Sequence, residues 1–161
     1  MMKYQRFDEL PAWQEAARLY QRVLDVVEEP NVPLSPTFRG NLERAALAVS
    51  NNIAESRDQM TGREAVSYLL DARAAATEVQ SMMAVVSPRP KLARLTEALQ
   101  QIRSLAESCG RQLSAWMSSI ESGPSRSKEP TNAPAPGPTP PGETGGPMAR
   151  RETQGPARAT R

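Results

Sequence analysis

Residues 36–57 read PTFRGNLERAALAVSNNIAESR, and this stretch decides the fold. Its apolar side chains recur at spacings of three and four residues, which places them on one face of a helix. Pro36 suits the first turn, where its missing N–H costs little, and Ser35 suits the N-cap before it. The sequence therefore predicts a helix over residues 36–57, with an inner face formed by Phe38, Leu42, Ala45, Ala46, Val49 and Ile53.

Three further stretches of the chain show the same periodicity. The first predicted helix covers residues 8–29, with Asp8 as its cap and Pro11 in its first turn. Another begins with TGRE at residues 61–64, which matches a capping box, and ends before Pro88. The last covers residues 91–121 and ends before Gly123.

Each of these helices has one predicted apolar face. The predicted core positions are Leu10, Trp13, Ala17, Tyr20, Leu24 and Val27 in the first helix; Val66, Leu69, Ala72, Ala76, Val79, Met83 and Val86 in the third; and Leu92, Leu95, Leu99, Ile102, Leu105 or Ala106, Cys109, Leu113, Trp116 or Met117, and Ile120 in the fourth. A three-helix arrangement would leave one apolar stripe in water. We therefore expect an all-α protein, an antiparallel up-down-up-down four-helix bundle over residues 1–122.

The composition changes sharply at residue 123. The 39 residues from there to the end include nine prolines and six glycines, and Met148 is their only large apolar side chain. Such a segment cannot bury enough surface to offset the entropy of ordering it. We expect residues 123–161 to form a disordered tail, with extended polyproline geometry over residues 133–141. A ligand for a groove is the alternative reading of that proline-rich run.

The charge of the predicted bundle is close to neutral. Residues 1–122 carry a net charge of −1 and residues 123–161 carry +3, so the basic character of the chain owes much to the tail. A flexible basic end can bind nucleic acid weakly and with strong salt dependence. Its terminal positive charges are Arg150, Arg151, Arg158 and Arg161.

Catalytic chemistry has few candidates in this sequence. The chain has no histidine, which removes the commonest general base and the commonest metal ligand. Cys109 is the single cysteine and falls at an apolar position, where a buried, inert thiol is expected. We therefore expect no enzyme activity, no metal and no cofactor. One cysteine and no apolar run of membrane-spanning length fit a cytoplasmic protein.

Three groups of residues carry a family resemblance. They are Asp8, Trp13-Gln14 and Ala17; Arg44-Ala45-Ala46 followed by Asn52-Ile53-Ala54-Glu55; and Glu64, Tyr68-Leu69, Ala72 and Glu78. On these motifs, residues 7–120 resemble a bacterial family of four-helix bundles. That family includes the proteins encoded by intervening sequences in large-subunit ribosomal RNA genes. It also includes the accessory variability protein of diversity-generating retroelements.

The resemblance implies a bundle without catalysis that associates with itself. The retroelement proteins form pentameric rings that bind a reverse transcriptase and RNA through a basic surface. This chain departs from the family at Glu43, where a basic residue is common, and at Ser56, where glycine is usual. The link between the second and third helices also carries fewer basic residues. These departures weaken the case for nucleic-acid binding by the bundle.

Two sets of candidate interaction residues remain open. Phosphate contacts near the ends of the second and third helices are predicted at Arg39, Arg57, Arg63 and Arg73. Neighbouring acidic residues favour the alternative, a solvated surface of mixed charge. Leu47, Ala54 and Leu70 point away from the apolar stripes of their own helices. They form either a subunit interface or scattered surface positions without a function.

Four further polar residues are expected to have structural roles. Glu55 and Glu78 lie off the apolar stripes, and we expect them to pair with Arg44 or Arg73 near helix boundaries. Asn52 lies at the edge of its stripe, where it either makes a structural hydrogen bond or contacts a ligand.

Taken together, these features favour a self-associating, non-enzymatic scaffold or accessory protein. The alternative is a nucleic-acid-binding accessory factor that works with a reverse transcriptase or with ribosomal RNA. The sequence identifies neither the partner nor the number of subunits.

Overall fold

The computed structural model describes residues 6–59 and 61–123. The predicted proline- and glycine-rich tail lies outside the described residues, apart from Gly123. Four α-helices run over Pro11–Val27 (α1), Pro36–Arg57 (α2), Gly62–Val86 (α3) and Thr96–Glu121 (α4). Two short 3-10 helices, Phe7–Glu9 (η1) and Pro90–Leu95 (η2), precede α1 and α4.

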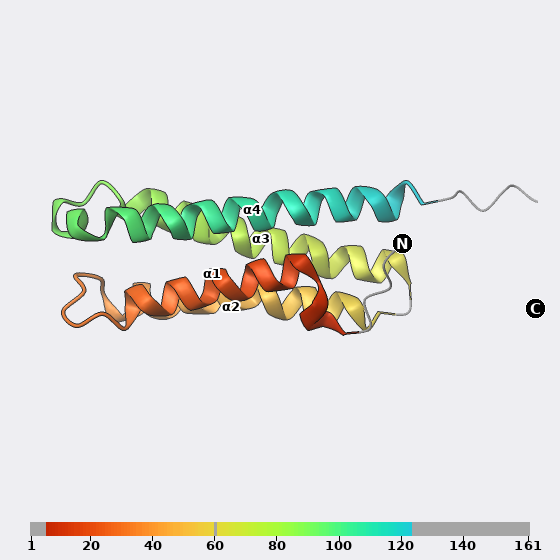
Figure 1. Ribbon diagram of the computed structural model, residues 1–161, viewed down its shortest axis with the longest axis horizontal. Helices are drawn as coiled ribbons and strands as arrows, with labels where there is room; N and C mark the ends of the chain where they lie inside the picture. The colour runs from red at the N-terminus through yellow and green to blue at the C-terminus, as the bar shows by residue number, and fades with distance from the viewer. Residues whose placement is uncertain (1–5, 60, 124–161) are drawn as a thin grey trace, which may run out of the picture. The chain divides into compact units, whose positions relative to one another are not determined.

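The helices form the expected four-helix bundle. Figure 1 shows that the α1–α2 and α3–α4 links lie at one end and the α2–α3 link at the other, so consecutive helices alternate in direction. Each helix packs against the helices before and after it in chain order, and α1 packs against α4. The described residues contain no strand.

The starts of α2 and α3 follow the sequence closely. The Ser35 hydroxyl accepts a hydrogen bond from the Phe38 backbone N–H at 3.2 Å. At α3, the Thr61 hydroxyl accepts from the Glu64 backbone N–H at 3.2 Å, and the Thr61 backbone N–H donates to the Glu64 carboxylate at 3.2 Å. Both predicted caps are therefore confirmed.

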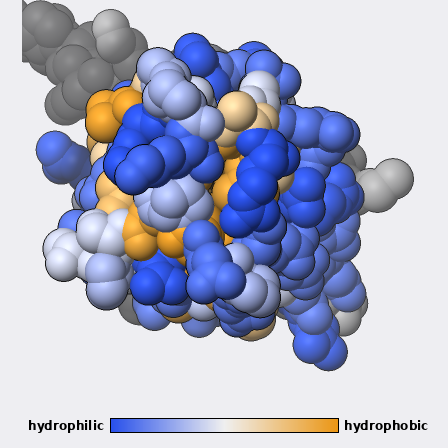
Figure 2. Space-filling view, turned by 90° about the vertical axis from the view of Figure 1, so that its left-hand side faces the viewer, coloured by the Kyte–Doolittle hydropathy of each residue, from blue (hydrophilic) through white to orange (hydrophobic). Residues whose placement is uncertain are grey.

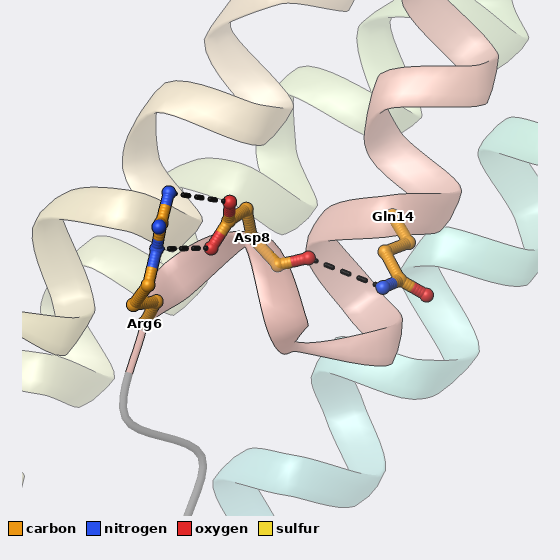
Figure 3. Close-up of polar contacts among 3 residues, drawn as sticks. All are labelled: Arg6, Asp8 and Gln14. Carbon is orange, nitrogen blue, oxygen red and sulfur yellow. Dashed lines mark hydrogen bonds and ion pairs between the residues drawn. The ribbon is translucent and has the colours of Figure 1, made fainter.

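The predicted start of α1 is wrong, because Asp8 has another partner. Figure 3 shows the Arg6 guanidinium donating two hydrogen bonds to the Asp8 carboxylate, with Nε 3.1 Å from Oδ1 and Nη2 2.9 Å from Oδ2. The Gln14 side-chain amide donates to the Asp8 backbone carbonyl at 3.1 Å. Asp8 thus belongs to the separate 3-10 turn, and α1 begins at Pro11 after Leu10 at the N-cap.

The predicted inner face of α1 also needs correction. The buried face is formed by Ala12, Ala16, Leu19, Val23, Val26 and Val27. Of the predicted set, Leu10 and Val27 are buried, whereas Trp13, Ala17, Tyr20 and Leu24 are only half-buried. The apolar surface of α1 is wider than one stripe, and its small alanines rather than its aromatic rings face the centre of the bundle.

The start of α4 differs from the prediction as well. Pro90–Leu95 forms a 3-10 helix, and the regular α-helix begins only at Thr96. Leu92 and Leu95 are buried nevertheless, because a spacing of three residues suits one 3-10 turn as well as one face of an α-helix. Of the alternatives left open in α4, Ala106 and Met117 are buried, whereas Leu105 and Trp116 are half-buried.

The predicted inner faces of α2 and α3 largely agree with the structure. Phe38, the first predicted core residue of α2, and Val66, the first of α3, are half-buried, and the remaining predicted positions of both helices are buried.

Candidate functional site

The four arginines that the sequence offered as phosphate contacts do not form one patch. Arg39 and Arg57 lie eighteen residues apart on α2, which is about 27 Å along the helix axis. Arg63 lies beyond the α2–α3 link, in the first turn of α3. The Arg73 side chain extends from α3 towards α4, where its Nη1 lies 3.4 Å from the Ser114 hydroxyl.

Among the residues expected to be structural, Arg44 and Glu78 form an ion pair. Arg44 Nη2 lies 3.0 Å from Glu78 Oε1 and links α2 to α3 on the outer surface. Glu78 lies in the middle of α3 rather than near a helix boundary. Glu55 forms no ion pair within the described residues, so the pairing expected for it is wrong. Asn52 donates to the Ala48 carbonyl of its own helix at 2.9 Å.

Two buried hydroxyls of α2 were missed at the sequence level. Ser50 and Ser56 are 6% and 4% exposed. Their hydroxyls donate to the carbonyls of Leu47 and Ile53, at 3.0 Å and 2.7 Å. Because each hydroxyl finds its acceptor within the helix, serine is tolerated at these two buried positions.

The three candidate interface residues do not share one surface of the bundle. Leu47 is 38% exposed, Leu70 is 44% exposed and Ala54 is half-buried. The Arg44 side chain extends towards α3. Leu47 and Ala54 are rotated about the α2 axis by about 60° and 80° from Arg44, away from α3 and towards α1. On α3, Leu70 lies about 60° from Arg73, whose side chain reaches α4. The structure therefore groups Leu47 with Ala54 and separates both from Leu70.

Half-buried residues of α1 extend the surface around Leu47. Glu15 and Arg22 line the groove between α1 and α4. Trp13 lies two residues before Glu15, and Tyr20 lies two residues before Arg22. Two residues correspond to a rotation of about 200° about the helix axis, so both aromatic side chains lie on the side of α1 that faces α2. Phe7 is 42% exposed, and its ring meets that of Trp13 edge-on at 5.3 Å between centroids.

These residues form what we call the apolar face, over α1 and α2. It consists of Phe7, Trp13, Ala17, Tyr20, Leu24, Leu47 and Ala54. Its four α1 members were predicted to lie in the core, because apolar periodicity alone does not separate the buried stripe of a helix from the apolar residues beside it.

The end of the bundle that carries the α1–α2 and α3–α4 links is mostly polar. Figure 2 looks at this end and shows a limited apolar area among hydrophilic residues. Val85, one residue before the end of α3, is 70% exposed. An ion pair between Arg94 and Glu29 ties the two links together.

Two open grooves of similar size run between helices. The α1–α4 groove has a volume of about 580 Å³, and Glu15, Arg22 and Glu97 contribute its charged groups. The α3–α4 groove has a volume of about 510 Å³, and its charged groups are Arg73, Glu107 and Arg111.

The Cys109 thiol is held in its neutral form. It is fully buried, and burial together with the nearby Glu15 charge raises its pKa from 9.0 to about 12. No cluster of three or more histidine, cysteine, aspartate or glutamate residues that could hold a metal ion occurs in the part of the chain that the structure describes. None of the described helices is both long and apolar enough to cross a membrane.

Comparison with known proteins identifies a family. The family model for the 23S rRNA-intervening sequence protein matches residues 8–115. This confirms the resemblance drawn from the helical motifs, and the match covers most of the described bundle. No curated protein and no solved structure matches the chain.

Proposed function

We propose that this chain, which belongs to the 23S rRNA-intervening sequence protein family, is a non-enzymatic cytoplasmic protein that associates with further copies of itself and serves as a scaffold or accessory factor. The observation that carries the proposal is the apolar face over α1 and α2. It brings exposed Phe7 and Leu47 together with the half-buried rings of Trp13 and Tyr20.

The composition of this face favours a contact with protein. Removing apolar surface from water contributes about 25 cal/mol for each Å² buried. Aromatic side chains are enriched at the centres of protein interfaces, where they bury a large area at a low cost in conformational entropy. Two copies that meet over this face would shield Phe7 and Leu47 from water, which the isolated bundle leaves 42% and 38% exposed.

The chemistry of the chain supports a non-enzymatic role. The sequence offers no histidine as a general base. The single thiol has its pKa raised to about 12, so it is protonated at neutral pH and is a poor nucleophile.

The test is the mass of the full chain in solution, measured by light scattering coupled to size exclusion at micromolar concentration. We expect a multiple of the 17.6 kDa chain mass for the unaltered protein. Leu47→Glu places a charge at the centre of the apolar face and should yield monomers. Val85→Glu is the matched control, because Val85 is more exposed but lies at the end of the bundle, and it should leave the mass unchanged.

A monomeric unaltered protein would overturn the proposal of self-association. If the protein is a multimer and Leu47→Glu and Val85→Glu both leave its mass unchanged, self-association stands but the apolar face is the wrong surface. Circular dichroism of both variants separates loss of association from loss of the fold.

A further inference from the structure

A second surface of the bundle has a different character. The α3–α4 groove is lined by polar side chains of two helices, including Arg73, Gln80, Arg111 and Ser114. In a bundle whose neighbours follow chain order, the α3–α4 surface lies opposite the apolar face over α1 and α2. Association over the apolar face therefore leaves this groove open to solvent.

The charge balance of the groove is positive. Arg103 lies one turn from Glu107, and its Nε is 3.2 Å from Glu107 Oε1, so the only acidic side chain lining the groove is already paired. Arg73 reaches only a hydroxyl, at 3.4 Å. Within residues 6–59 and 61–123, no hydrogen bond or ion pair engages the Arg111 guanidinium. Two guanidinium groups thus face one groove with their charge unneutralised.

Neutral donors lie beside these two arginines. The Ser114 hydroxyl accepts from Arg73 and keeps its own proton for a further acceptor. The Gln80 side-chain amide also lines the groove and supplies two N–H donors. Arginine and neutral donors on facing helices form a set suited to an oxyanion.

A glycine within α4 keeps the groove hollow. Gly110 lies in the middle of a 26-residue helix, where glycine costs about 1 kcal/mol relative to alanine. Packing does not require glycine there, because the nearest heavy atom to an added Cβ would be Gln80 Nε2 at 3.8 Å, an ordinary contact. The missing methyl group instead leaves more room in the groove, which Gly110 itself lines.

The α1–α4 groove provides an internal comparison. It is slightly larger, yet its charged lining has two carboxylates, Glu15 and Glu97, against one arginine, Arg22. That arginine is paired with Asp25 at 3.1 Å. Size therefore does not distinguish the α3–α4 groove from the α1–α4 groove. The difference is that Arg73 and Arg111 form no ion pair within the described residues, whereas Arg22 does.

We propose that the α3–α4 groove binds a phosphate group, free or esterified, held between the guanidinium groups of Arg73 and Arg111. Ser114 and Gln80 donate to its remaining oxygens. Planar guanidinium groups match phosphate oxygens in pairs, and such charge-assisted bonds are about twice as strong as neutral ones. The site does not depend on self-association, because its residues all come from one chain.

The test is residue-resolved NMR of the full chain, titrated with pyrophosphate at low ionic strength and with sodium chloride of matched ionic strength. We expect pyrophosphate, but not chloride, to shift the Gly110 and Ser114 amides and the side-chain Nε–H groups of Arg73 and Arg111. A short RNA duplex is titrated in parallel as the esterified form of phosphate.

Three variants give the test its controls. Arg73→Gln combined with Arg111→Gln should weaken pyrophosphate binding by about tenfold or more, since two charge-assisted contacts are lost. Arg18→Gln removes one exposed positive charge of α1 and should change binding by less than about twofold. Gly110→Ala keeps all charges but fills the floor of the groove, and it should weaken binding while the helix remains folded.

The outcomes separate the two sources of phosphate and the failure of the proposal. Binding of pyrophosphate alone assigns the groove to a free phosphate, and binding of the duplex that depends on Arg111 assigns it to a phosphodiester backbone. Shifts that are absent from the groove, or equally weakened by Arg18→Gln and by the double variant, would overturn the proposal.

Discussion

Gly40 offers a sharp test of how α2 is built. It is the fifth residue of α2, and a Cβ added there would meet no heavy atom within 4 Å beyond its chain neighbours and its own helix backbone. Alanine restricts the unfolded chain more than glycine does, and here it meets no steric cost. Gly40→Ala should therefore raise the free energy of unfolding by about 1 kcal/mol.

The matched comparison is Gly62, the first residue of α3. A Cβ at that position would lie 3.1 Å from Ile120 Cγ2 of α4, which is closer than ordinary contact, so the Ile120 side chain would have to give way. Gly62→Ala should therefore give no gain in stability. Comparing the two variants separates the steric effect of the added methyl group from the general preference of helices for alanine over glycine.

The assay is thermal and denaturant unfolding followed by circular dichroism, at one fixed protein concentration because association also contributes to stability. A gain of 1 kcal/mol raises the midpoint by roughly 3–6 °C for a bundle of this size. Loss of stability in Gly40→Ala, or an equal gain in Gly62→Ala, would refute the packing described around these two glycines.

Four further changes test the caps, the core, the surface and the thiol. Thr61→Ala removes the cap of α3 and should cost about 1 kcal/mol in denaturant unfolding. Ile53→Ala empties a fully buried site, so it should cost about 2–5 kcal/mol, and a loss below 1 kcal/mol would contradict its place in the core. Glu78→Gln breaks an exposed ion pair with Arg44 and should change stability by less than about 1 kcal/mol. Because the pKa of Cys109 is raised to about 12, the folded state keeps the thiol proton while the unfolded state loses it above pH 9. The free energy of unfolding should therefore fall between pH 9 and 12, and it should fall less steeply in Cys109→Ala when the two proteins are measured side by side.

The parts of the fold that sequence reasoning recovered are those where one local signal had no competitor. Ser35 and Thr61 are followed by residues whose backbone amides they can accept, and both caps form as expected. In α2 and α3 the apolar stripe is narrow, so period and burial agree from Leu42 to Ile53 and from Leu69 to Val86.

The errors arise where two arrangements satisfy the same pattern. Asp8 can cap a helix or pair with Arg6, and in the structure its carboxylate pairs with the Arg6 guanidinium. Leu92 and Leu95 fit a 3-10 turn as well as an α-helix. In α1 the residues of the apolar face follow the same three-and-four spacing as the buried face, and only the positions of α2 and α4 decide which stripe faces inwards.

The candidate sites were harder to predict, because they depend on which helices are neighbours. Leu47 and Leu70 look equivalent in the sequence, yet they lie on different sides of the bundle. Arg73 was predicted as a phosphate contact together with Arg39, Arg57 and Arg63. In the structure it lines the same groove as Arg111, and no local pattern in the sequence of α4 singles out Arg111.

The central claim is that copies of this chain meet over the apolar face, and Trp13 reports on it directly. Trp116→Phe leaves Trp13 as the single tryptophan of the chain. Its emission and the mass of the protein are then followed together through a dilution series. We predict that the emission shifts to the red over the same concentrations at which the mass falls to that of one chain. A falling mass with unchanged Trp13 emission would contradict the assigned surface, and a mass of one chain throughout would contradict self-association itself.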